Sequence, residues 1–276
     1  MENWEICEKE CFEYLKLKYA NKNCSFEHNG GSDSTKSDIL LKKNGIACFY
    51  IESKMPNAQC GQFVVLKDDE RKTFFYSPKN HYEENLQSKV IIEEMNKQFD
   101  FYKNPGTKGI NLDMPMSYLY DWVYHFYTDN KKAKYFIIEK ELGNQFSDNF
   151  IIFPVQRLHK YITVNAKYRA KKSGSANPTQ NNFEDIKNAA KSEGFTVSNL
   201  VIKNKYVFAE LDAAPSIYKM TGEDYKYQFK HEKKNLFKVT RLSKTCNSNV
   251  IFDISPIGEL KQNEKDLETF EAEFKY

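Results

Sequence analysis

Two carboxylates and a lysine near the start of the chain have the types and spacing that phosphate chemistry needs. In the apolar segment 46–54, side chains of an extended strand alternate between two faces, so Glu52 and Lys54 lie on the same side. Asp38 directly precedes another apolar run, and the Asn-Gly pair between the runs predicts a hairpin of strands 39–43 and 46–54. If these strands pair, Asp38 lies beside Glu52 and Lys54.

This combination suits metal-assisted hydrolysis of a phosphodiester. Two carboxylates can hold Mg²⁺, which prefers oxygen ligands and keeps several waters. The ion would lower the pKa of a bound water and neutralise charge in the transition state, and the lysine can hold or activate the attacking water. Glu10 or Glu13 of a predicted first helix could add an outer carboxylate. The alternative is an exposed strand end with a salt bridge across its face, worth about 0–1 kcal/mol.

A further set of charged residues forms a strongly basic stretch. The whole chain is nearly balanced, with 41 basic and 38 acidic side chains and a formal net charge of +3, which says little about partners because local fields decide binding. The segment 157–172 contains no Asp or Glu, and its basic residues are Arg157, Lys160, Lys167, Arg169, Lys171 and Lys172. Such a run is often only a solvated face, but here it favours a patch that faces phosphates.

The loop that follows this stretch contains side chains that can read DNA bases. Lys and Arg can donate to guanine O6 and N7, Ser and Asn can serve bases or phosphates, and glycine permits close backbone approach. The candidate DNA-binding residues here are Arg169, Lys171, Lys172, Ser173, Ser175 and Asn177. The alternative is a basic loop that touches only phosphates. Gln59 and Gln62 follow the strand of Glu52 closely enough to face DNA or metal-bound water, although a turn position in solvent explains them equally well.

The remaining apolar pattern predicts a mixed α/β (α+β) chain. Helices are expected near 4–19 and over 86–101, 116–127, 183–193 and 264–274, where apolar residues recur every three or four positions. Short apolar runs between turn residues predict further strands over 63–66, 73–76, 133–139, 150–153, 161–170, 200–202, 206–211, 236–240 and 250–254.

Composition and cysteine usage restrict the class further. Hydrophobic residues make up 40% of the 276 positions, enough for a buried core. No apolar run approaches the ~18 residues of a membrane span, and the first residues lack the pattern of a signal peptide, so we expect a soluble, unexported, cytoplasmic protein. The cysteines form no C-x-x-C pair and lack His at zinc-finger spacing, so we expect reduced thiols, with Cys48 in the core.

Several strings of residues carry a more specific signal. Ser37-Asp38 followed by Glu52-Ser53-Lys54 resembles the motif of the PD-(D/E)xK nuclease superfamily, with Ser in place of Pro. Longer strings resemble the HhaI-type type II restriction endonucleases and occur in order over residues 32–255: Phe49–Pro56, Gln59–Val64, Tyr76–Asn80, Asn149–Pro154, Tyr168–Arg169, Lys171–Ser175 and Asn249–Phe252. Two departures, Ser53 where alanine is common and a slightly long hairpin, fall outside the predicted catalytic face.

The resemblance implies a restriction-endonuclease-like core, with a central mixed β-sheet flanked by helices and additional small mixed-sheet lobes. It implies Mg²⁺-dependent cleavage of duplex DNA at a short palindrome such as GCGC by a monomer, with a companion methyltransferase that protects the host. Asp38, Glu52 and Lys54 would carry catalysis, and Asp38, Glu52 and Ser53 would bind the metal. Lys79 and Asn80 join the candidate DNA contacts.

We expect residues 1–144 to form the catalytic core and residues 145–180 with 245–276 to form the module that recognises the DNA sequence. Residues 181–244 would be an added lobe that holds DNA nonspecifically through its lysines. Two other functions fit the same pattern of residues. One is a repair or recombination nuclease of the same fold, and the other is a DNA-binding protein without catalytic activity.

Overall fold

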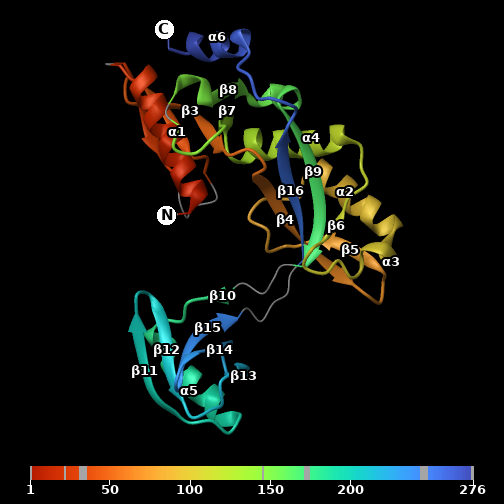
Figure 1. Ribbon diagram of the computed structural model, residues 1–276. Coiled ribbons are helices and arrows are strands. Elements are labelled where there is room, and N and C mark those ends of the chain that lie inside the picture. Colours follow the sequence, from red (N-terminus) through yellow and green to blue (C-terminus); the bar gives the residue numbers. More distant parts are fainter. Residues whose placement is uncertain are drawn as a thin grey trace. The chain divides into compact units, whose positions relative to one another are not determined.

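The chain folds into two compact units (Figure 1). The larger unit contains Met1–Arg169 and Ser248–Tyr276, and the smaller contains Ala170–Asn247. The smaller unit is therefore inserted between two parts of the larger one. The structure is a computed structural model, and it describes residues 2–21, 23–30, 36–144, 146–170, 175–242 and 248–274.

The helices of the described residues are mostly short. The α-helices are α1 (Asn3–Tyr19), α2 (Leu86–Lys97), α3 (Phe99–Tyr102), α4 (Met116–His125), α5 (Phe183–Ser192) and α6 (Glu264–Ala272). A π-helix, η1 (Phe126–Asn130), extends α4. The 3₁₀ helices are η2 (Ser147–Asn149), η3 (Val155–Lys160) and η4 (Gln180–Asn182).

One sheet of the larger unit has the strand order β1-β2-β3-β7-β8. Its neighbours run antiparallel except β3 and β7, which are parallel. A parallel pair needs a long crossover, and here the crossover contains β4, β5 and the helices α2 to α4. The strands are β1 (Cys24–His28), β2 (Ile39–Lys43), β3 (Ile46–Lys54), β7 (Ala133–Glu139) and β8 (Phe150–Pro154).

This mixed sheet separates two hydrophobic layers. Successive residues of β7 point to opposite faces, so Tyr135 and Ile137 pack with α1 and α6 while Phe136 and Ile138 pack with α4 and the second sheet. All four side chains are buried. The central mixed sheet flanked by helices confirms the predicted fold class.

The second sheet of the larger unit has the order β5-β4-β16-β9-β6 and brings distant segments together. In Figure 1 the blue strand β16 lies between β4 and β9. Val250 of β16 pairs with Phe63 of β4, and the ring of Phe252 stacks on Trp122 of α4 with 3.8 Å between centroids. The strands are β4 (Gln59–Asp68), β5 (Thr73–Tyr76), β6 (Ile110–Asn111), β9 (Ile162–Ala170) and β16 (Ser248–Pro256).

The smaller unit is an antiparallel sheet with one helix on it. The order β11-β12-β15-β14-β13 is extended by β10, which pairs with β15. Its core includes Ile186 of α5, Phe229 of β14 and Phe237 of β15, all fully buried. The strands are β10 (Ser175–Ala176), β11 (Val197–Lys203), β12 (Tyr206–Leu211), β13 (Ile217–Thr221), β14 (Lys226–Lys233) and β15 (Leu236–Leu242).

The structure divides the chain at positions other than the predicted ones. Most of the segment 145–180 expected to form a recognition module, including β8 and β9, lies in the larger unit with the predicted catalytic residues. The smaller unit begins at residue 170 rather than 181. Its sheet includes β13 and β14, which the sequence analysis missed because polar residues such as Lys219 in β13 and Gln228 in β14 interrupt their apolar runs.

The expectation that Cys48 lies in the core was wrong. Leu41 pairs with Phe49, but Lys42 pairs with Ala47, so Cys48 is the extra residue of a β-bulge. Its side chain is exposed. The bulge accommodates one residue of the slightly long hairpin. Beyond it Ile39 pairs with Ile51, and the Asp38 carboxylate accepts a hydrogen bond from the N–H of Ser53.

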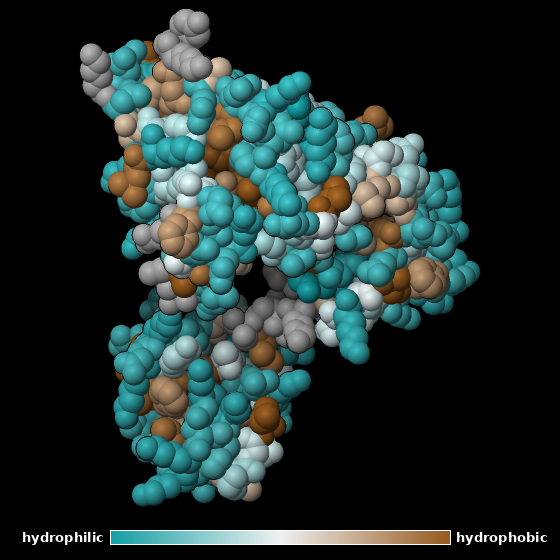
Figure 2. Space-filling view, turned by 45° about the horizontal axis from the view of Figure 1, so that its top comes forward, coloured by the Kyte–Doolittle hydropathy of each residue, from teal (hydrophilic) through white to brown (hydrophobic). Residues whose placement is uncertain are grey.

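The distribution of hydropathy over the surface is seen from one side in Figure 2. Figure 2 shows a mainly hydrophilic face with hydrophobic side chains in small, scattered groups. Across the described parts of the chain, every helix is too short or too polar to cross a lipid bilayer.

Candidate active site

The predicted meeting of Asp38 with the end of β3 is present in the structure. Asp38 precedes β2, and its Oδ2 accepts a hydrogen bond of 2.8 Å from the backbone N–H of Ser53. The neighbouring Glu52 accepts a 2.6 Å hydrogen bond at Oε1 from Nζ of Lys54. Two carboxylates and an ammonium therefore lie together at the end of a rigid strand pair.

Burial and charge set the protonation of these groups. Burial and the nearby charge of Glu52 raise the pKa of Asp38 to about 8. Burial also opposes ionisation of Glu52, but Lys54 and Lys131 outweigh it and lower the pKa of that carboxyl. Burial disfavours the charged form of Lys54, yet Glu52, Tyr127 and Asp38 raise its pKa well above the ordinary value. Glu52 is thus held ionised beside a charged lysine.

The residues present fit a small, hard cation. Glu52 is 1% exposed, and its second oxygen, Oε2, is buried without a hydrogen-bond partner in the described structure. Asp38 supplies a further carboxylate, and Ser53, whose side chain alternates to the other face of β3, could contribute through its backbone carbonyl. An all-oxygen set with an uncompensated carboxylate oxygen is the donor type that Mg²⁺ prefers. Asp38, Glu52 and Ser53 are the residues that could hold it.

Sequence reasoning missed a second cation at this site, Lys131. Its Nζ lies 3.5 Å from Glu52 Oε1, and its side chain is 10% exposed. Lys131 caps the C-terminal end of the π-helix η1, and its N–H donates to the carbonyl of Phe126. Lys54 and Lys131 both lie over the ring of the buried Tyr127, with Nζ 5.7 and 5.5 Å from its centroid. No sequence motif predicts that Lys131 belongs to this site. It approaches β3 only because the crossover and the π-helix η1 place it just before β7, the strand that pairs with β3.

The carboxylate of the first helix that interacts with this cluster is Glu8, whereas the sequence led us to expect Glu10 or Glu13. Burial raises the pKa of Glu8, and the charges of Lys54, Glu52 and Lys131 act on it. Glu8 lies 3.8 Å from Nε2 of His28. The periodicity of α1 contained this signal, because position 8 lies one turn before the buried Cys11 and two turns before the buried Leu15.

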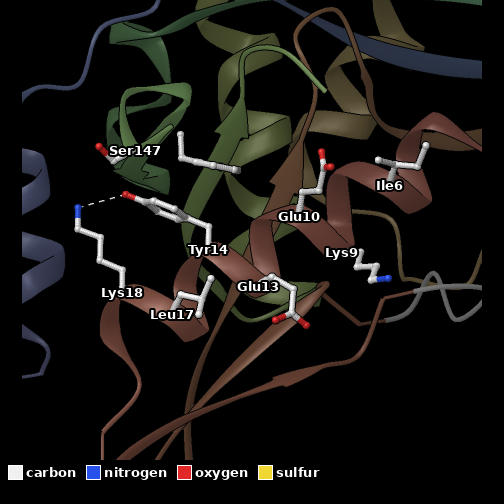
Figure 3. Close-up of a pocket in the computed structure, with 9 residues that line it drawn as sticks. Ile6, Lys9, Glu10, Glu13, Tyr14, Leu17, Lys18 and Ser147 are labelled. Atoms are coloured by element: carbon white, nitrogen blue, oxygen red, sulfur yellow. Dashed lines mark hydrogen bonds between the residues drawn. The ribbon is translucent and has the colours of Figure 1, made fainter. Parts of the chain in front are cut away.

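Glu10 and Glu13 lie on a different part of α1. Both line a hollow of about 680 Å³ between α1 and the start of β8, together with Tyr14 and Phe150. Figure 3 shows their side chains pointing in different directions along this hollow. Oε2 of Glu10 accepts a hydrogen bond of 2.9 Å from the N–H of Gly143.

A second hollow, of about 360 Å³, is lined by Lys54 and Lys131 together with several predicted DNA contacts. Gln62 accepts a hydrogen bond of 3.1 Å from the buried Asn249. Both polar atoms of the Asn80 side chain hydrogen-bond to the backbone of Val64 and so hold β4 against the segment of Asn80. The predicted residues that line this hollow are Lys54, Gln59, Gln62, Lys79 and Asn80, and Lys131 lines it as well.

Although the basic stretch 157–172 contains no acidic residue, two of its side chains pair with acidic residues from elsewhere in the chain. Arg157 pairs with Asp266 at 2.9 Å, and Lys167 pairs with Asp253 at 2.6 Å. Arg169 lies on β9, where Gly109 passes so close that a Cβ on Gly109 would lie 2.8 Å from the Arg169 Cβ. Two of the basic charges therefore stabilise the larger unit.

The remaining predicted DNA contacts belong to the segment after Arg169. Lys171, Lys172 and Ser173 lie outside the described residues. The backbone of Ser175 pairs with Leu242 in the smaller unit, where Asn177 is exposed.

Carboxylates on paired strands with a lysine two residues on, in a mixed α/β core, are typical of the restriction-endonuclease class of nucleases. Among solved structures, HhaI endonuclease in complex with DNA is similar over 100% of both chains, with 34% sequence identity and a TM-score of 0.74. The chain belongs to the HhaI endonuclease family. No protein-family model and no curated protein sequence matches it.

Proposed function

We infer that the chain is a type II restriction endonuclease that hydrolyses duplex DNA with Mg²⁺ at a short palindrome, GCGC being the expected site. The observation that carries the proposal is the cluster of Asp38, Glu52 and Lys54 on one strand pair in a member of the HhaI endonuclease family. The buried, unpartnered Oε2 of Glu52 supports a metal ligand at this position.

The chain's own residues divide the chemistry between them. Asp38, Glu52 and Ser53 would hold the ion, which when bound supplies a water of lowered pKa and neutralises charge on the reacting phosphate. The ammonium of Lys54 holds the attacking water and stabilises the charge that develops on the phosphate oxygens. Lys131, 3.5 Å from the same Glu52 oxygen, adds a second positive charge at the reacting centre.

Duplex DNA is the proposed substrate because the solved member of the family is bound to DNA. Lys79, Gln59 and Gln62 line the hollow beside Lys54 and would meet the strand being cut. Sequence recognition is assigned to Arg169 and to the loop after it, with Lys171, Lys172, Ser173, Ser175 and Asn177 as the candidate contacts. The smaller unit would hold DNA through its lysines.

The biological setting follows from this activity. A restriction enzyme needs a companion methyltransferase that protects the host's own DNA, and both would act in the cytoplasm. We propose that the enzyme acts as a monomer that cuts one strand at a time. Size-exclusion chromatography with light scattering, with and without a cognate duplex, measures that state directly.

One digest separates this function from its rivals. Purified protein is incubated with plasmid and Mg²⁺, with EDTA as the control. Discrete bands support a restriction enzyme, a smear indicates a repair or recombination nuclease, and uncut plasmid with retained DNA binding indicates a protein without catalytic activity.

The GCGC site is tested on a pair of synthetic duplexes that differ only at that tetranucleotide. Cleavage of the GCGC duplex alone supports the assignment. Equal cleavage of both duplexes, or discrete bands that map to another sequence, would reject GCGC while leaving the nuclease activity in place.

A further inference from the structure

The core behind the active site contains two thiols and a carboxylate that the proposed reaction does not use. Cys7 and Cys11 lie one turn apart on the buried face of α1, and Glu139 ends β7. One ligand atom from each residue lies within 4.8 Å of the other two. All three side chains are at most 2% exposed.

The spacing of the two sulfur atoms matches a tetrahedral metal site. Sγ of Cys7 lies 4.0 Å from Sγ of Cys11. Zinc–sulfur bonds of about 2.3 Å at tetrahedral angles place two thiolates about 3.8 Å apart. The helix therefore presents both sulfurs at the required separation without rearrangement.

The carboxylate supplies an independent reason to expect a cation. Glu139 is 1% exposed, and neither of its oxygens has a hydrogen-bond partner in the described structure. A buried carboxylate is costly unless it is paired or coordinates a metal. Burial, followed by the neighbouring Glu10 and Cys7, raises the pKa of Glu139 to about 9, and neither neighbour brings a positive charge.

We propose that Cys7, Cys11 and Glu139 bind a thiophilic divalent cation of the Zn²⁺ class. Two soft sulfur donors exclude Mg²⁺ and favour Zn²⁺. The half-buried Glu10, whose side chain interacts with Glu139, is the candidate for the fourth ligand, with water as the alternative. The ion would fasten α1 to β7, the strand parallel to β3, and so fix the helix that carries Glu8 toward the catalytic lysines.

Cobalt spectroscopy of the intact chain tests the site without any variant. Metal-free protein is titrated with Co²⁺, and we expect a near-ultraviolet thiolate-to-cobalt band that saturates at one ion per chain. Zn²⁺ should abolish the band, and excess Mg²⁺ should leave it unchanged. Absence of the band in folded wild-type protein would overturn the proposal.

Variants then assign the ligands. Cys7→Ser, Cys11→Ser and Glu139→Gln should each weaken Zn²⁺ binding, measured by competition with a chromophoric chelator, by more than ~100-fold, since outer-shell changes alone cost about 10–100-fold. Cys48→Ser, at the exposed thiol, and Glu52→Ala, at the Mg²⁺ site, are the matched controls and should bind Zn²⁺ as wild type does. Loss of the cobalt band in either control, or its persistence in both cysteine variants, would reject these ligands.

The same ion should stabilise the fold. A ligand that binds only the folded state raises stability, so Zn²⁺ should raise the melting temperature of wild type and of Cys48→Ser but not of Glu139→Gln. Circular dichroism confirms that each variant is folded before the comparison. An equal rise in all three proteins would contradict the assignment.

Discussion

Lys131 reaches the same carboxylate oxygen of Glu52 as Lys54 does, although 79 residues separate Lys131 from Glu52 in the sequence. One buried carboxylate is thus flanked by two ammonium groups, at 2.6 and 3.5 Å. The pair provides more positive charge than Glu52 alone can balance. The excess is available for the phosphate that the proposed reaction brings into the site.

We expect Lys131→Ala to slow cleavage by about 10²–10³-fold, as the loss of one group that stabilises transition-state charge does elsewhere. Affinity for DNA should change little, because the ammonium acts on the reacting phosphate. Single-turnover cleavage and equilibrium binding on the same duplex separate the two effects. Lys134→Ala, at a lysine paired with Glu273, is the control. A cleavage rate for Lys131→Ala equal to the control's would remove Lys131 from the site.

Glu52→Ala and Lys54→Ala should abolish cleavage, because each removes a group that acts on the transition state rather than on ground-state binding. Ca²⁺, which is larger and less strict in geometry than Mg²⁺, should support binding but poor cleavage. The measurement is cleavage of a labelled duplex in Mg²⁺, in Ca²⁺ and in EDTA. Near-normal cutting by either variant, or brisk cutting in EDTA, would show that the catalytic groups lie elsewhere.

Binding of a divalent cation should strengthen with pH. The pKa of Asp38 is raised to about 8, so below that pH the cation must displace a proton. We expect affinity for Ca²⁺ to rise by up to about tenfold per pH unit and to level off above about pH 8. Calorimetric titration at several pH values measures this slope. Asp38→Asn should bind more weakly and lose the slope, and a wild-type affinity independent of pH would contradict the assignment.

The raised pKa of Asp38 also makes the stability of the fold depend on pH. Between the ordinary pKa of 3.8 and about 8, the folded protein holds the Asp38 proton more tightly than the unfolded chain does. The contribution of Asp38 to the free energy of unfolding of the metal-free protein therefore falls as pH rises through this range. Asp38→Asn should show a flatter dependence than wild type in denaturant titrations.

Arg169→Ala and Lys172→Ala should lower affinity for the cognate duplex while leaving nonspecific affinity nearly unchanged. A side chain that reads guanine with two hydrogen bonds contributes about 1–3 kcal/mol of discrimination, whereas a phosphate contact weakens binding evenly across sequences. Glu52→Ala should do the reverse, keeping the preference and losing the cut. Binding to cognate and scrambled duplexes in Ca²⁺ across a salt series gives the result. Equal losses on both duplexes with a shallower salt slope would make this segment a phosphate clamp.

Local sequence patterns predicted the β2–β3 hairpin and the three residues of the candidate site that lie on it or next to it. The Asn-Gly turn defines the hairpin of β2 and β3, and the strand period then places Asp38, Glu52 and Lys54 together. The residue that the pattern misplaced, Cys48, sits at a bulge, where the period of two breaks.

What sequence reasoning missed depends on contacts between distant segments. Lys131 reaches Glu52 only after the crossover and the π-turn have formed, and Asp266 neutralises Arg157 from the far end of the chain. Glu8 could have been chosen from helical period alone, because it lies one turn before the buried Cys11 and two turns before the buried Leu15. Glu10 and Glu13 are acidic but belong to another face.

The position of β16 in the second sheet has a consequence for synthesis on the ribosome. This strand lies between β4 and β9, yet it follows the whole smaller unit in the sequence. The ribosome therefore synthesises the whole smaller unit before it synthesises β16. Until residues from 248 onward emerge, the edges of β4 and β9 that pair with β16 remain unpaired. Because chains fold as they are made, the inserted unit can be native first, and the exposed edges are the stage most open to aggregation or chaperone binding.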